Sequence, residues 1–185
     1  MAGFNAHGTA SPAALPADYI IQQMHDFHEG VRQSAEPRKE NVEQMIDIAK
    51  GMTDEEIEDA ASYYASVAWT PWIRVVETEM VPKIWNRNGM FHRLEGSDAG
   101  VEPIRNRIIE MPEDSERTLL RDTRSGFIAY VPLGAVAKGE DLVRTGGGKT
   151  IQYAICHGED LNGIGSVPGI AARSPSYLVR QLYDI

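Results

Sequence analysis

Residues 171–185 read AARSPSYLVRQLYDI, and residues 13–27 read AALPADYIIQQMHDF. The two stretches align at a constant offset of 158, with identities at both alanines, a tyrosine, a glutamine and an aspartate. Aliphatic residues match between these identities, which indicates two copies of one helical unit rather than two unrelated amphipathic helices. At this offset the counterpart of Cys156 would precede Met1 and the counterpart of Met45 would follow Ile185, so we expect both copies to be incomplete.

Helical patterns begin within the first copy and continue toward the middle of the chain. Apolar residues recur at helical spacing over 18–30 and again over 42–50. A third helix is predicted to begin after Thr53, because a threonine followed three residues later by Glu56 is typical of a capping box.

The middle of the chain has a different pattern. Short β-prone runs at 73–76, 107–110 and 127–131 are separated by Gly, Pro and Asn, which predicts an irregular segment with a few strands. Helical character returns over 136–145, and a last helix is predicted to begin at Ser174–Pro175. We therefore expect a mainly α fold, in which helical parts are joined by this irregular segment.

The charge of the chain limits its partners. The 185 residues include 18 Lys and Arg against 27 Asp and Glu, a formal net charge of −9. This charge disfavours binding to nucleic acid and to anionic membrane surfaces. No stretch approaches the roughly 20 apolar residues of a membrane span, and the first residues have neither the basic nor the apolar region of an export signal.

The single cysteine excludes several kinds of site that need more than one sulfur. One cysteine cannot form an intramolecular disulfide, a four-thiolate zinc site or an iron–sulfur cluster. Cys156 is followed by His157, and taken alone this pair favours a buried structural cysteine beside an ordinary histidine. In a second interpretation the cysteine sulfur forms a thioether with a haem vinyl group and the adjacent histidine reaches the iron.

The surrounding residues support the second interpretation by resemblance. Residues 153–163 read YAICHGEDLNG, and residues 167–184 read VPGIAARSPSYLVRQLYD. This part resembles the haem-binding half of a class I c-type cytochrome of the bacterial dihaem kind, where a C-x-x-C-H-G motif precedes a D-L-x-G loop, a proline turn and an S-P-S-Y-L-x-R-Q-L helix. Residues 27–66 resemble the other half, and residues 71–77 and 124–132 resemble the linker of these two-domain proteins.

The resemblance implies a role for five residues. Cys156 would carry the haem thioether, and Tyr153 stands where the family has its first haem cysteine, so at most one thioether can form. His157 would be the proximal iron ligand and Pro168 would lie near it, while Met45 is the family-matched distal ligand. The implied cofactor is haem c.

The resemblance also implies a domain organisation. Residues 1–68 would be the back half of a cytochrome c-like domain, 69–135 an irregular linker with short strands, and 136–185 a front half with the attachment motif. The two halves could pair within one chain as a permuted domain or between chains as a swapped homodimer. Alternatively, the sequence is a fragment or a degenerate relative.

The function implied by the resemblance is electron transfer rather than enzymatic catalysis. The acidic chain would suit a redox partner with a basic docking patch, and the family resemblance implies a periplasmic location. The alternative is a haemless, cytochrome-derived scaffold or partner-binding module, which the tyrosine at position 153 also suggests.

Overall fold

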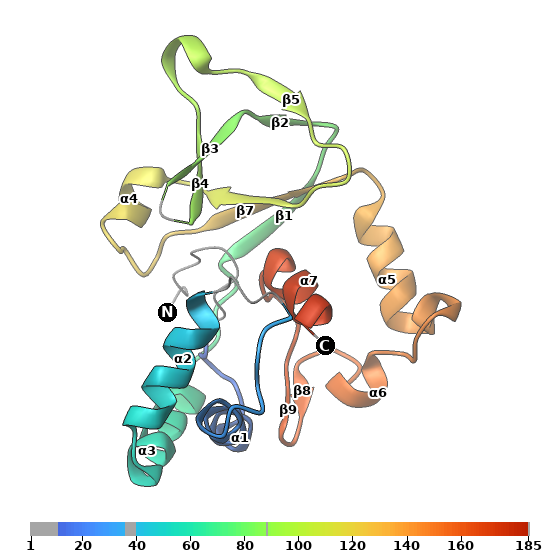
Figure 1. The fold of residues 1–185 in the computed structure, drawn as a ribbon. Coiled ribbons are helices and arrows are strands. Elements are labelled where there is room, and N and C mark those ends of the chain that lie inside the picture. Colours follow the sequence, from blue (N-terminus) through green and yellow to red (C-terminus); the bar gives the residue numbers. More distant parts are fainter. Residues whose placement is uncertain (1–10, 36–39, 88, 185) are drawn as a thin grey trace.

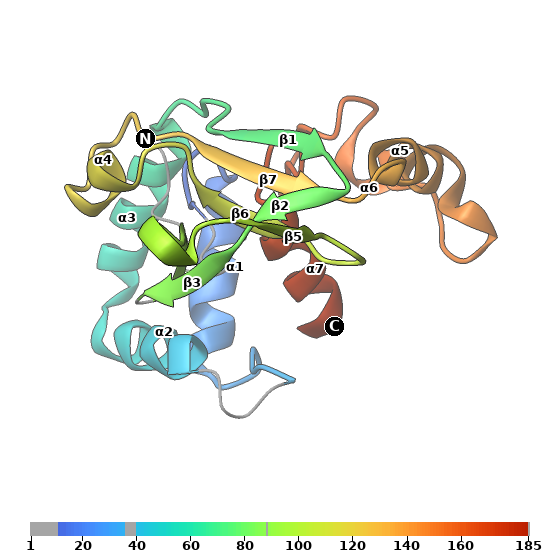
Figure 2. The ribbon, with the colours of Figure 1, turned by 90° about the horizontal axis from the view of Figure 1, so that it is seen from above.

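The computed structural model describes residues 11–35, 40–87 and 89–184. The elements form three parts: helices α1 to α3, a group of small sheets, and a C-terminal part that ends in α7 (Figure 1). Helix α7 lies between the first helices and the sheets (Figures 1 and 2). Hydrogen bonds join it to Arg32, which follows α1, and to Glu110 of the sheet.

The first part consists of three helices, α1 (Ala17–His28), α2 (Glu40–Gly51) and α3 (Asp54–Ser66). Helix α1 packs against both α2 and α3, and α3 buries Ile57 and Ala61. The predicted capping box is confirmed, because the Glu56 amide donates to Thr53 Oγ1 at 3.3 Å and the Thr53 amide donates to Glu56 Oε2 at 2.8 Å. These bonds to Thr53 hold the pKa of the Glu56 carboxyl below its ordinary value.

The second part is built from strands. Its elements are β1 (Ile73–Glu77), β2 (Met80–Pro82), β3 (Ile84–Arg87), β4 (Met90–Arg93), η1 (Gly96–Asp98), β5 (Val101–Pro103), β6 (Ile109–Pro112), α4 (Ser115–Leu119) and β7 (Phe127–Val131). Strand β7 is central in a three-stranded sheet, parallel to β1 and antiparallel to β6. Strands β2 and β5 form one antiparallel pair, and β3 and β4 form another.

Two apolar clusters form the core of this second part. One gathers Trp72, Met90 and Phe127, with the rings of Trp72 and Phe127 edge to face at 5.3 Å. The other gathers Val81, Ile104 and Ile109. All four residues of β6 are buried, so this strand lies inside the molecule although it is an edge strand of its sheet.

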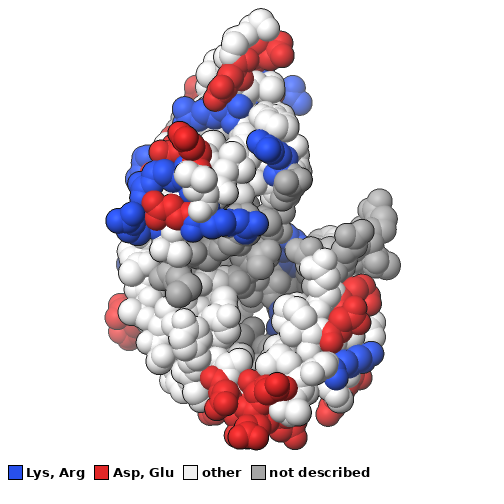
Figure 3. Space-filling model, turned by 90° about the vertical axis from the view of Figure 1, so that its left-hand side faces the viewer, with Lys and Arg blue, Asp and Glu red and all other residues white. Residues whose placement is uncertain are grey.

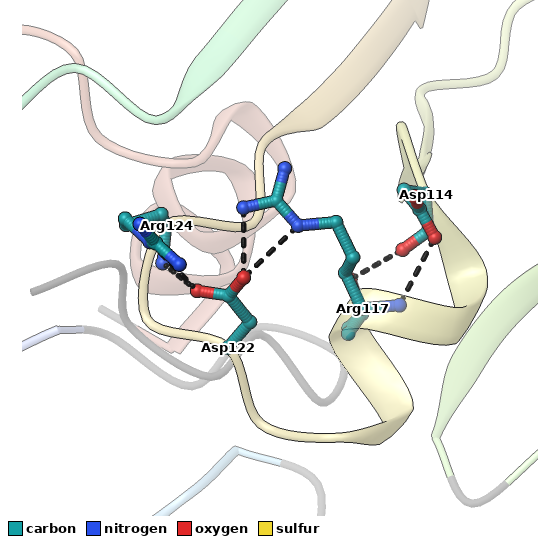
Figure 4. A network of polar contacts seen from close by, with 5 residues as sticks. Asp114, Arg117, Asp122 and Arg124 are labelled. Carbon is teal, nitrogen blue, oxygen red and sulfur yellow. Dashed lines mark hydrogen bonds and ion pairs between the residues drawn. The ribbon is translucent and has the colours of Figure 1, made fainter.

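A polar network closes the loop around α4 (Figure 4). The Asp114 side chain caps the helix by accepting from the Arg117 amide at 3.0 Å. The Asp122 carboxylate accepts from the Arg124 backbone amide at 2.9 Å and from Arg117 Nη2 at 2.7 Å. These donors, with that backbone amide contributing most, lower the pKa of Asp122 to about 2.

The third part contains α5 (Ala135–Thr145), η2 (Gly146–Gly148), α6 (Ala154–His157), β8 (Gly163–Ile164), β9 (Val167–Pro168) and α7 (Pro175–Asp184). Strands β8 and β9 form a two-residue antiparallel hairpin that packs against α6. The predicted helix over 136–145 and the predicted last helix are both confirmed.

The predicted mainly α fold is wrong. The structure is 42% helical and 19% strand, which makes it a mixed α/β fold. The three β-prone runs do overlap β1, β6 and β7, but these strands pair with one another in a sheet with its own buried core instead of lying in an irregular segment. Among the described residues, no helix combines the length and the apolar character needed to cross a membrane.

Candidate functional site

The candidate site is built on the short helix α6. The Tyr153 carbonyl accepts from the backbone amides of Cys156 and His157, at 3.2 and 3.0 Å. The Tyr153 amide in turn donates to the Val143 carbonyl at 3.1 Å, which ties α6 to α5. Within this turn the Cys156 side chain is exposed, whereas Tyr153 and His157 are half-buried.

The orientation of His157 is set by one hydrogen bond. Its Nδ1 lies 2.8 Å from the carbonyl oxygen of Pro168. Because a carbonyl can only accept, Nδ1 must carry the proton in this contact, and in the neutral ring Nε2 then keeps its lone pair. Histidines that bind metals are oriented in this way, with the other nitrogen held by a carbonyl or a carboxylate.

Two glycines allow the loop beneath His157 to be tight. A Cβ atom on Gly163 would lie 2.6 Å from the Val167 carbonyl oxygen, and one on Gly169 would lie 2.6 Å from the Asn162 carbonyl oxygen. Both contacts are too short for a side chain. The glycines therefore let the two sides of the β8–β9 hairpin approach closely, and the Pro168 carbonyl of this hairpin contacts Nδ1 at the edge of the imidazole ring.

The N-terminus of α7 is fastened to the sheet by a buried carboxylate. Glu110 of β6 is 8% exposed, and its oxygens accept from Ser174 Oγ at 2.7 Å and from the Ser176 amide at 2.8 Å. Ser174 Oγ also accepts from the Tyr177 amide at 3.1 Å, which confirms its predicted role as the helix cap. An acidic group at a helix N-terminus is electrostatically favourable, so this contact joins the third part to the second.

The two repeat copies also meet at an arginine. Arg32 donates to the side chain of Gln23 on α1 and, at 2.9 Å, to Gln181 Oε1 on α7. These two glutamines are counterparts at the offset of 158, as are Tyr19 and Tyr177. Burial, with a smaller effect of Tyr19, raises the pKa of Tyr177. Arg32 therefore bridges α1 and α7 through two glutamines at equivalent positions of the repeat.

The structure brings four of the five predicted residues together and places the fifth elsewhere. Tyr153, Cys156 and His157 belong to one turn, and Pro168 contacts His157. Met45 is half-buried on α2, which packs on α1. Both views show α2 and α6 on opposite sides of the molecule (Figures 1 and 2). Within one chain, Met45 therefore does not face His157.

Sequence reasoning missed three residues that support this site, namely Glu110, Arg173 and Arg32. A charged residue inside the apolar run 108–112 was a signal that Glu110 has a buried partner. Arg173 stands where the first repeat copy has Leu15, so a charged residue replaces an apolar one at this position of the repeat. No local signal predicts the contact of Arg32, because its partner lies 149 residues away.

The negative charge is concentrated in the first helices. Residues 1–68 contain 4 Lys and Arg against 12 Asp and Glu, whereas residues 69–135 contain 9 against 10 and residues 136–185 contain 5 against 5. Figure 3 shows acidic side chains gathered at the lower end of the molecule, where α2 and α3 meet in Figure 1. Lys and Arg side chains gather higher, at the level of the sheets.

Comparisons of the chain with protein-family models, with curated proteins and with solved structures found no significant match.

Proposed function

We propose that the chain is a c-type cytochrome-like electron-transfer protein that holds haem through Cys156 and His157. The observation that carries this proposal is the 2.8 Å contact between His157 Nδ1 and the Pro168 carbonyl. It orients the ring and leaves Nε2 as an electron-pair donor, the form that an axial ligand requires.

The neighbouring residues fit the same group. The exposed Cys156 precedes His157 directly, so its sulfur is available for a thioether next to the ligating ring. Gly158 follows with a φ of 82°, so the backbone turns away immediately after the histidine without a side chain. Tyr153 stands where the family has its first haem cysteine, which limits the chain to one thioether.

Each part of the chain has a role in this proposal. Bound haem would supply the one-electron iron couple. Helix α6 holds the attachment residues, the β8–β9 hairpin supplies the Pro168 carbonyl, and Glu110 ties the following helix α7 to the sheet. Because hydrogen bonds hold each of these supports, His157 would keep its place during electron transfer.

The acidic first part would attract the redox partner by long-range steering rather than form the electron-transfer contact, because α3 and α6 lie on opposite sides of the molecule (Figures 1 and 2). Five acidic residues at the start of α3 are exposed, and their local charge is not balanced by basic neighbours in 1–68. A partner with a basic patch would be steered to this surface, faster at low salt than at high salt. Such partners would be periplasmic electron carriers, as the family resemblance implies.

Met45 enters this proposal only through a second copy of the chain. Since α2 and α6 lie apart in one chain, a sulfur ligand from Met45 would require the swapped homodimer. A Met45→Leu variant that removed a sulfur-to-iron charge-transfer band would support that arrangement, and an unchanged spectrum would exclude Met45 as the ligand.

The test is expression of the chain together with cytochrome c attachment machinery, followed by visible and pyridine haemochrome spectra. A haemochrome shifted from the two-thioether position is expected, because only Cys156 can react. His157→Asn should lower haem incorporation strongly, whereas the matched control His28→Asn, which changes an exposed histidine of α1, should leave it unchanged. A folded protein without haem would contradict the proposal.

That contrary result would favour the second candidate, a haemless scaffold derived from a cytochrome. The observation behind it is the half-buried Tyr153 in the place of an attachment cysteine. In that case Cys156 and His157 would be remnants, and substituting either one should leave partner binding unchanged.

A further inference from the structure

The His157 contact depends on where the Pro168 carbonyl points. Pro168 ends β9 and is followed by Gly169. Proline has a fixed φ, but glycine is the residue with the widest backbone freedom, so the chain could turn at this point. The amides of Ile170 and Ala171 hold the following residues by donating to the Leu161 carbonyl at 2.8 and 3.0 Å. A contact to the Gly169 carbonyl itself would limit the freedom that remains.

Arg173 supplies such a contact. Its Nε donates to the Gly169 carbonyl at 3.3 Å. Its two terminal nitrogens donate to backbone carbonyls of the N-terminal segment, Nη1 to Ser11 at 2.9 Å and Nη2 to Ala13 at 3.2 Å. One guanidinium group thus joins the loop below His157 to a segment about 160 residues earlier in the chain.

The surroundings of Arg173 make this guanidinium rigid. The residue is 9% exposed, and its guanidinium carbon lies 3.9 Å from the centre of the Trp69 ring. Burial lowers the pKa of the Arg173 side chain, so the charge carries a solvation cost that the three carbonyls and the ring offset. A lysine could not make the same contacts, because only the planar guanidinium of arginine places its N–H groups on all three carbonyl oxygens at once.

We propose that Arg173 is a positioning residue for His157, which clamps the Gly169 carbonyl to the Ser11–Ala13 segment and so keeps the Pro168 carbonyl on His157 Nδ1. The inference deepens the proposed function and rests on it, since a fixed ring matters most for a metal ligand. The hydrogen bond itself exists in the haem-free chain, so it can be tested there.

The test is the tautomer of His157, measured from its ring nitrogen chemical shifts in the ¹⁵N-labelled, haem-free full chain. The wild type should show mainly the tautomer with the proton on Nδ1. In Arg173→Met the ratio of this tautomer to the other should fall by about tenfold, the effect of losing one ordinary hydrogen bond. In Arg173→Lys, which keeps the charge but loses the fork, the ratio should fall in the same direction by a smaller factor.

Two controls separate positioning from general destabilisation. Arg144→Met changes an arginine of α5 whose side chain is 75% exposed, and the tautomer ratio should not change. Ile57→Ala removes a core side chain of α3, and it should lower stability without changing the ratio. If Arg173→Met fails to fold, Arg173→Lys carries the test.

An unchanged tautomer ratio in the folded Arg173 variants would overturn the inference. This outcome is distinct from failure of the proposed function, because the measurement uses no haem. A chain that shows the expected shift but never attaches haem would keep Arg173 as the residue that positions His157 and would remove only the electron-transfer role.

Discussion

Helices α1 and α7 carry two copies of one sequence pattern, yet they are held in place by different forces. Helix α1 is covered by α2 and α3. Helix α7 is fixed at its N-terminus by Glu110 and along one side by Arg32, and it leaves apolar side chains exposed. These are Val179 at 53%, Leu182 at 57% and Tyr183 at 68%, whereas their counterparts Ile21, Met24 and His25 are half-buried.

The difference shows that an amphipathic pattern alone does not decide how a helix is stabilised. In α1 the apolar face contributes through burial, which is proportional to the area removed from water. In α7 much of the equivalent face remains in water, and a few polar contacts position the helix instead. The N-terminal helices should therefore be sensitive to loss of volume, and α7 to loss of hydrogen bonds.

The largest effect is expected in the apolar part. Ile57→Ala should lower the free energy of unfolding by about 3 kcal/mol, because Ile57 is 2% exposed and its removal leaves a cavity. The matched change on α7, Leu182→Ala, should cost about 0.5 kcal/mol or less, since that side chain is 57% exposed. Ile57 belongs to α3, which covers α1. Urea unfolding measures both variants, and similar losses would show that the N-terminal helices and α7 are stabilised alike.

The next effect concerns the polar anchor of α7. Glu110→Ala should lower the free energy of unfolding by about 2.5 kcal/mol, because Ser174 Oγ and the Ser176 amide lose a charged, buried acceptor. Glu113→Ala, three residues further on, removes a partly exposed ion pair with Arg74 and should cost about 0.5 kcal/mol. Equal stabilities of the two variants would contradict the role given to Glu110.

A smaller effect separates the two helix caps. Thr53→Ala removes an exposed cap of α3 and should cost about 1 kcal/mol. Ser174→Ala removes a cap that is 4% exposed and also leaves Glu110 without its hydroxyl donor, so about 2 kcal/mol is expected. Thermal unfolding of both variants measures these losses of stability. A greater loss for Thr53→Ala than for Ser174→Ala would contradict the larger contribution assigned to the buried cap.

The smallest effect is a pH dependence of the free energy of unfolding, caused by Asp122 in the loop that follows α4. Hydrogen bonds lower the pKa of Asp122 from 3.8 to about 2, so the folded state binds its proton less tightly than the unfolded state. The stabilising contribution is thus present above 3.8 and is lost as the pH falls through about 2. Urea midpoints measured across this interval should fall less in Asp122→Asn than in the wild type, and parallel curves would refute the contribution.

The sequence predicted those elements whose signals are local. The helices at 18–30, 136–145 and 174–185 and the capping box at Thr53 all follow from spacing, caps and turn residues within a few positions. The fold class was missed because β2 to β5, β8 and β9 are two to four residues long. Strands this short give no clear alternation of apolar and polar residues, whether they pair locally, as β3 with β4 and β8 with β9, or at a distance, as β2 with β5.

The candidate site also contains residues that the sequence predicted and residues that it did not. The turn with Tyr153, Cys156 and His157 is a local motif, and the family resemblance named all three together with Pro168. The supports could not be predicted, because Glu110 and Arg173 act on residues 64 and 162 positions away. Such contacts exist only once the three parts of the chain are assembled.

The central claim is that Cys156 and His157 together hold one haem. The most direct test is the intact mass of the full chain purified from cells that express the attachment machinery, with Cys156→Ser beside it. The account predicts a wild-type mass raised by one haem and a variant of unmodified mass. An unmodified wild-type mass in a folded protein would contradict it.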